Sequence, residues 1–157
     1  MSRYQHLITD ENRKWWTLGA MCLALFMIML DNTVVNVALP SIQEDLGTTI
    51  SGLEWIVNGY TLSFAVLLAV GGRLGDIFGR RKMFVVGVIV FTFASTTAGF
   101  APNDFALVAS RVLQGAGAAF MMPGTLSIIT DAFPAHERGK AIGTWAGVSA
   151  LALAIGP

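Results

Sequence analysis

Long apolar segments constrain the fold of this chain more than any other feature. Polar clusters separate five of them, over residues 16–39, 53–71, 83–101, 105–130 and 141–157. A helix rises about 1.5 Å per residue, so roughly 20 residues cross the hydrocarbon core of a bilayer. The first four segments are long enough to cross, and we expect the fifth to be a span that is cut off within its helix. The composition, with 54% hydrophobic and only 13% charged residues, also suits lipid better than water.

The predicted fold is all-α, a polytopic transmembrane helix bundle over residues 16–157, preceded by a cytoplasmic amino-terminal segment over residues 1–15. A soluble bundle would need a polar face on each helix, and no segment has a charged stripe. A secretory signal is a poor alternative for the first segment, because its apolar run is longer than a typical signal core and lacks a clear cleavage site. We therefore expect a retained span.

Basic residues predict the orientation of the bundle. The connections 40–52 and 102–104 contain no Lys or Arg, whereas every connection on the other side is basic. Cytoplasmic loops carry the excess of Lys and Arg, so we expect a multi-pass protein of the plasma or cell inner membrane with a cytoplasmic amino terminus. The basic residues outside the spans are Arg3, Arg13, Lys14, Arg73, Arg80, Arg81, Lys82, Arg138 and Lys140.

Arg111 is the one basic residue that lies within a span. A charge at mid-bilayer costs at least about 2.5–3.5 kcal/mol, so it normally faces protein or water. Gln114 shares its helical face, and the small residues 115–119 follow, which would let another helix approach closely. We expect Arg111 to pair with polar groups of other spans. The alternative is an arginine that extends its side chain to the outer membrane surface.

Asp31 lies about two thirds of the way along the first span, next to Asn32 and near Asn36. Burial favours the protonated form of a carboxyl group, and a neighbouring arginine favours the ionised form. Together these effects can produce a group that changes charge near neutral pH. The alternative is a structural hydrogen bond from Asp31 to a neighbouring helix.

The connection "GGRLGDIFGRRKMF", residues 71–84, combines spaced glycines with charges. Gly72, Gly75 and Gly79 suit a tight turn, Asp76 lies between them, and a basic triplet follows. The orientation rule explains the triplet but not Asp76 or the glycine spacing.

Other chemistries have no residues to carry them. The near-neutral net charge gives no sign of a nucleic-acid surface, and the single cysteine, Cys22, can form no internal disulfide. Residues 115–120 resemble a dinucleotide fingerprint but fail at its last position, and the common hydrolase and phosphate-loop motifs are missing. We therefore expect neither an enzyme nor a cofactor site.

Taken together, the motifs resemble those of the major facilitator superfamily. Residues 72–81 resemble its loop signature between spans two and three, and residues 107–119 resemble its span-four signature. The stretch "LDNTVVNVALP" is similar to the drug:proton antiporter branch with fourteen spans, and "GTWAGVSALALAIGP" to the start of the span-five antiporter signature.

The resemblance implies proton-coupled efflux of small hydrophobic or cationic solutes. In that picture Asp31, Arg111 and Gln114 take part in proton coupling or substrate binding. Asp31 is the leading proton or substrate site, and Arg111 adjusts how readily a carboxylate takes up a proton. Asp76 and Arg80 hold the two transporter halves together at the cytoplasmic face, and Asp131 is a partner for the basic cluster that includes Arg81. Gly147, Gly156 and Pro157 let span five bend and pack closely. These residues of the amino-terminal part are expected to act with a second half that is missing here. The alternatives are an uptake symporter with another cargo and a non-transporting membrane scaffold.

Overall fold

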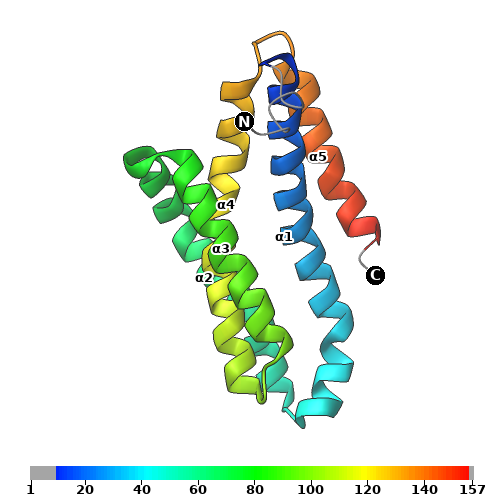
Figure 1. Ribbon diagram of the computed structural model, residues 1–157. Helices are drawn as coiled ribbons and strands as arrows, with labels where there is room; N and C mark the ends of the chain where they lie inside the picture. Colours follow the sequence, from blue (N-terminus) through cyan, green and yellow to red (C-terminus); the bar gives the residue numbers. More distant parts are fainter. Residues whose placement is uncertain (1–9, 156–157) are drawn as a thin grey trace, which may run out of the picture.

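The computed structural model describes residues 10–155, and within that range the chain forms five helices and no strand (Figure 1). Gly156, Pro157 and the first nine residues lie outside the described residues. Helices α1 to α4 are each long and apolar enough to cross a membrane. The bounds are α1 Asp10–Leu46, α2 Ile50–Phe78, α3 Arg80–Gly99, α4 Asp104–Ala132 and α5 Arg138–Ile155.

The connections are short because the helices extend beyond the apolar segments. Helix α1 continues through Pro40, although proline lacks the N–H that would bond to the carbonyl of Asn36. Helix α2 begins where the Thr49 hydroxyl accepts a hydrogen bond from the Gly52 N–H, and Asn103 caps α4 in the same way. Capping side chains, rather than the limits of the apolar run, therefore decide where these helices begin.

Helix α4 is the centre of the bundle, with α2 and α3 packed along it and α1 packed against α5 (Figure 1). Glycines bring the backbones of α3 and α4 into contact. A Cβ atom on Gly117 would lie 2.7 Å from the backbone nitrogen of Phe91, and one on Gly87 would lie 2.7 Å from the Gly117 carbonyl oxygen. Small residues thus allow the close helix packing that membrane bundles use in place of a hydrophobic driving force.

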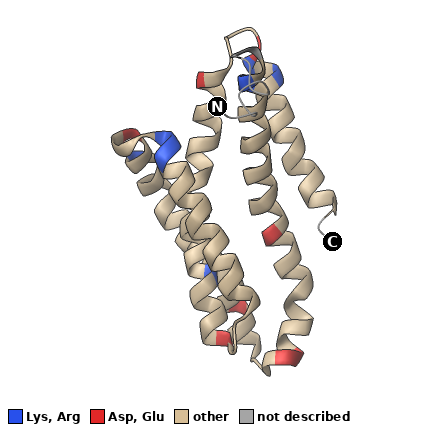
Figure 2. Cartoon of the chain, viewed as in Figure 1, with Lys and Arg blue, Asp and Glu red and all other residues tan. Residues whose placement is uncertain are grey.

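Most Lys and Arg residues lie at one end of the bundle, whereas acidic residues lie at both ends (Figure 2). One end, which we call the basic end, holds the start of α1, the α2–α3 junction and the α4–α5 connection. The acidic residues Glu44, Asp45 and Asp104 lie at the opposite end. Of the Lys and Arg residues that the structure describes, Arg111 alone lies in the interior of the bundle. The basic end carries Arg13, Lys14, Arg73, Arg80, Arg81, Lys82, Arg138 and Lys140.

Candidate functional site

A closed hydrogen-bonded triangle joins α1 to α4 inside the bundle. The Arg111 Nη1 donates to Asp31 Oδ2 over 2.5 Å and to Gln114 Oε1 over 2.8 Å. The Gln114 Nε2 donates to Asp31 Oδ1 over 2.8 Å, which closes the triangle. Arg111 and Gln114 meet because three residues separate them on one helix, so their side chains share a face. The structure thus brings together all three residues that the sequence suggested for this site.

The triangle is almost completely shielded from the surroundings. The Arg111 side chain is 2% exposed, whereas that of Asp31 is 14% exposed. The guanidinium lies against the carboxylate of α1, in the interior, instead of extending toward the end of α4. Asp31 is therefore the more exposed member of the pair.

Tyr60 of α2 completes the surroundings of Arg111. Its ring centroid lies 4.4 Å from the guanidinium carbon, and its hydroxyl accepts a hydrogen bond of 3.3 Å from Asn32 Nδ2. Among the described residues, none accepts a hydrogen bond from Arg111 Nε. The sequence analysis missed Tyr60, because only the packing of α2 against α4 shows which of its residues faces Arg111.

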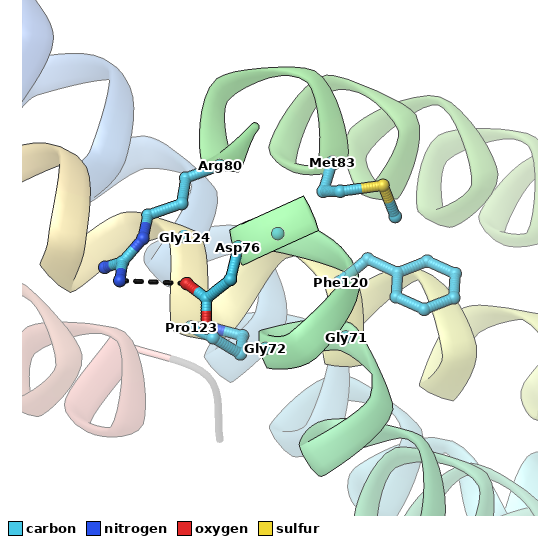
Figure 3. Close-up of a pocket in the computed structure, with 9 residues that line it drawn as sticks. Gly71, Gly72, Asp76, Arg80, Met83, Phe120, Pro123 and Gly124 are labelled. Carbon is cyan, nitrogen blue, oxygen red and sulfur yellow. Dashed lines mark hydrogen bonds and ion pairs between the residues drawn. The ribbon is translucent and has the colours of Figure 1, made fainter. Parts of the chain in front are cut away.

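A second polar cluster lies at the α2–α3 junction. Gly79 turns the chain with φ +97°, a conformation that residues with a side chain rarely adopt. Asp76 and Arg80 lie on either side of it and form an ion pair of 3.0 Å, drawn as a dashed line in Figure 3. Arg80 also donates to the hydroxyl of Ser127 on α4. The turn is therefore tied to α4 by one arginine.

A cavity of about 140 Å³ lies beside this ion pair, between α2, α3 and α4 (Figure 3). Gly72 and Gly75 line it, and a Cβ atom on either would meet its neighbours at ordinary van der Waals distances of 3.7–3.9 Å. In this conformation the two glycines leave open space next to α4 instead of forming a tight contact.

The remaining predicted residues lie apart from these clusters. Asp131 lines a cavity with Arg13 and Lys14 of α1, and among the described residues it forms no ion pair with Arg80 or Arg81. Ser127, one helical turn earlier on α4, takes the contact with Arg80. Arg81 lines a groove between α1 and α3. Gly147 is exposed, and among the described residues outside its own stretch of helix no atom lies within 4 Å of a Cβ atom built on it.

An ion pair that the sequence analysis did not anticipate fastens α1 to the α4–α5 connection. Lys14 Nζ donates to Glu137 Oε2 over 2.5 Å, and this hydrogen bond lowers the pKa of Glu137 below its usual value. The Trp15 ring packs edge-on against Phe133 at 5.4 Å between centroids, and Lys140 lies over the same Trp15 ring. The basic end of α1 and the start of α5 are thus held together.

These features define a class of protein. Four membrane-length helices, close glycine contacts between them and a charged pair enclosed where the helices meet are the properties of a multi-pass membrane protein with a polar interior site. Within the described residues, His, Cys, Asp and Glu side chains gather in no group of three or more that could hold a metal ion.

Residues 21–157 match the family profile of the Major Facilitator Superfamily. The chain belongs to this superfamily.

Several curated relatives are similar to almost the whole chain. This chain is 47% identical over 145 residues to the probable actinorhodin transporter of Streptomyces coelicolor. The aligned region covers 92% of this chain and 25% of that relative. It is 44% identical over 147 residues to a puromycin resistance protein of Streptomyces alboniger, covering 93% and 29% of the two chains. Identity to the tetracenomycin C resistance and export protein of Streptomyces glaucescens is 42% over 147 residues, covering 94% and 27%. The chain spans about a quarter of the length of these relatives.

Proposed function

We propose that this chain forms part of a secondary transporter that exports small hydrophobic or cationic compounds in exchange for protons. The observation that carries the proposal is the enclosed triangle of Asp31, Arg111 and Gln114. Intramembrane charges are costly, and in transporters they mark ion and substrate pathways. The names of the relatives, which refer to actinorhodin, puromycin and tetracenomycin C, support export of such compounds.

The triangle suits a site that gains and loses a proton. When the Asp31 carboxylate takes up a proton, its charge attraction to Arg111 is lost, while Gln114 Oε1 still accepts from the guanidinium. The contact between α1 and α4 weakens as a result. Alternating access rocks packed helices around a site near the membrane midplane, so a proton-dependent contact between two of them can couple protonation to that motion.

The basic end of the bundle and α5 have their own parts in this proposal. The basic end faces the cytoplasm, as the distribution of Lys and Arg favours, in a plasma or cell inner membrane. There the Asp76–Arg80 pair holds the turn in place, with Arg81 and Asp131 available for contacts in another state of the cycle. Gly147 faces open space, which leaves room for another helix to approach α5 in such a state; Gly156 and Pro157 follow it in the sequence.

Exchange of segments between relatives tests the proposal. Residues 1–157 are substituted for the aligned segment of the Streptomyces alboniger puromycin resistance protein, and radiolabelled puromycin is followed in inside-out vesicles with an imposed proton gradient. We expect accumulation that a protonophore abolishes. Asp31→Asn should remove the dependence of accumulation on the proton gradient. Asp45→Asn, a matched change on an exposed residue in the last turn of α1, should leave this dependence unchanged.

Three results would contradict the proposal. Gradient-driven accumulation in Asp31→Asn would exclude Asp31 from coupling. Puromycin leaving the vesicles together with protons would indicate the symport direction. A chimera that inserts correctly but moves no puromycin would favour a scaffold.

A further inference from the structure

The ring of Tyr60 is placed to bind the charge of Arg111. Its centroid lies 4.4 Å from the guanidinium carbon, well within the distance of about 6 Å at which a cation is attracted to an aromatic face. Tyr60 is only 4% exposed, so water does not compete for that face. The hydrogen bond from Asn32 links the Tyr60 hydroxyl to α1.

The attraction of the ring for Arg111 depends on the charge of Asp31. While the carboxylate is ionised, it competes with the ring face for the charge of the guanidinium. Once Asp31 is protonated, the guanidinium keeps its full charge and has lost its strongest partner. Gln114 Oε1 remains as an acceptor, and Arg111 Nε has none within the part of the chain that the structure describes. The ring therefore stabilises the protonated state of the site more than the ionised state.

We propose that Tyr60 is a positioning residue that holds the Arg111 charge while Asp31 is neutral, and so favours the uptake of a proton by Asp31. This inference rests on the function proposed above, in which Asp31 carries the proton. In this role Tyr60 acts through Arg111, whose guanidinium lies over its ring.

The other groups near Asp31 leave this role to Tyr60. From α4, Arg111 and Gln114 contact the carboxylate, and Arg111 is the only charged one. From α2, Tyr60 is the titratable residue at the site, and it contacts Asn32 through its hydroxyl and Arg111 through its ring. Among the described residues, α3 and α5 contribute no ion pair or hydrogen bond to Asp31. Changes at the ring thus reach Asp31 by way of the guanidinium.

The test measures protonation of Asp31 directly in the 157-residue chain, purified and placed in lipid nanodiscs. The infrared band of the protonated carboxyl group is followed as a function of pH, and its absence in Asp31→Asn assigns it. Tyr60→Leu should move the midpoint of this band to lower pH by about 0.5–1 pH unit. Tyr60→Phe keeps the ring and should keep the wild-type midpoint.

A graded series separates ring charge from packing. Phenylalanines of increasing fluorine content at position 60 weaken the negative ring face with little change of shape, and the midpoint should fall with each step. Phe64→Leu is the matched control, because Phe64 stacks on Tyr60 at 6.1 Å without lying over Arg111; it should leave the midpoint unchanged.

Two outcomes would overturn the inference in distinguishable ways. A titrating Asp31 band whose midpoint ignores the fluorinated series would refute the role of Tyr60 and leave the proposed function intact. A wild-type chain without any titrating band that depends on Asp31 would refute both.

Discussion

Replacing Arg111 by methionine should lower the free energy of unfolding by about 3 kcal/mol. Breaking a buried ion pair by removing one partner costs about 3–5 kcal/mol, because the other charge is left without compensation. Here the change removes the hydrogen bonds of 2.5 Å to Asp31 and 2.8 Å to Gln114. We place the value at the low end of that range since the Asp31 side chain keeps 14% exposure and can recover part of its solvation.

Removing both charges should cost much less. Well-packed apolar residues often replace a buried ion pair with little loss, so Arg111→Met combined with Asp31→Leu should come within about 1 kcal/mol of the wild type. Reversible unfolding of the chain in bicelles, followed by circular dichroism, measures all three variants. Arg73→Met removes an exposed charge from the basic end and serves as the control. A loss below about 1 kcal/mol for Arg111→Met alone would refute the reasoning, because it would match the cost expected for an arginine that reaches water.

Two further predictions concern packing and pH. Gly117→Ala places a Cβ atom 2.7 Å from the backbone nitrogen of Phe91 and should destabilise the bundle, since overpacking costs about 1–3 kcal/mol. Gly147→Ala, whose Cβ atom meets no neighbouring helix within 4 Å, should be neutral or stabilising by up to about 1 kcal/mol. Equal shifts of the melting temperature in the two variants would contradict the close packing at Gly117. Glu137→Gln should lower the melting temperature at neutral pH. Because Lys14 lowers the pKa of Glu137 from 4.5, this difference should persist above pH 4.5 and disappear as pH falls through the lowered value. A difference that remains unchanged once Glu137 is protonated would show that the ion pair does not cause it.

Much of the fold could be predicted from local sequence. The length of each apolar segment predicts a membrane helix without knowledge of its neighbours, and four of the described helices have that character. The Arg111 site could be predicted from the sequence for a related reason. A guanidinium within a span demands a partner, and Asp31 is the acidic residue nearest the middle of another span.

Contacts that depend on helix neighbours could not be predicted in this way. Membrane helices are apolar on most sides, so periodicity does not reveal which face of α2 turns Tyr60 toward Arg111. The Lys14–Glu137 pair joins residues 123 positions apart, at the ends of elements whose mutual placement the sequence does not state. Likewise, Ser127 and Asp131 lie one turn apart on α4, and only the packed structure shows that Ser127 receives Arg80.

The proposed exchange of a compound for protons requires Asp31 to release its proton as the compound binds. The direct measurement is the release of protons when puromycin is added to the purified chimera in weakly buffered solution, followed with a pH-sensitive dye. We predict that the chimera with the natural Asp31 releases protons on binding and that Asp31→Asn, still able to bind puromycin, releases none. Equal release by the two proteins would show that the proton leaves from another group.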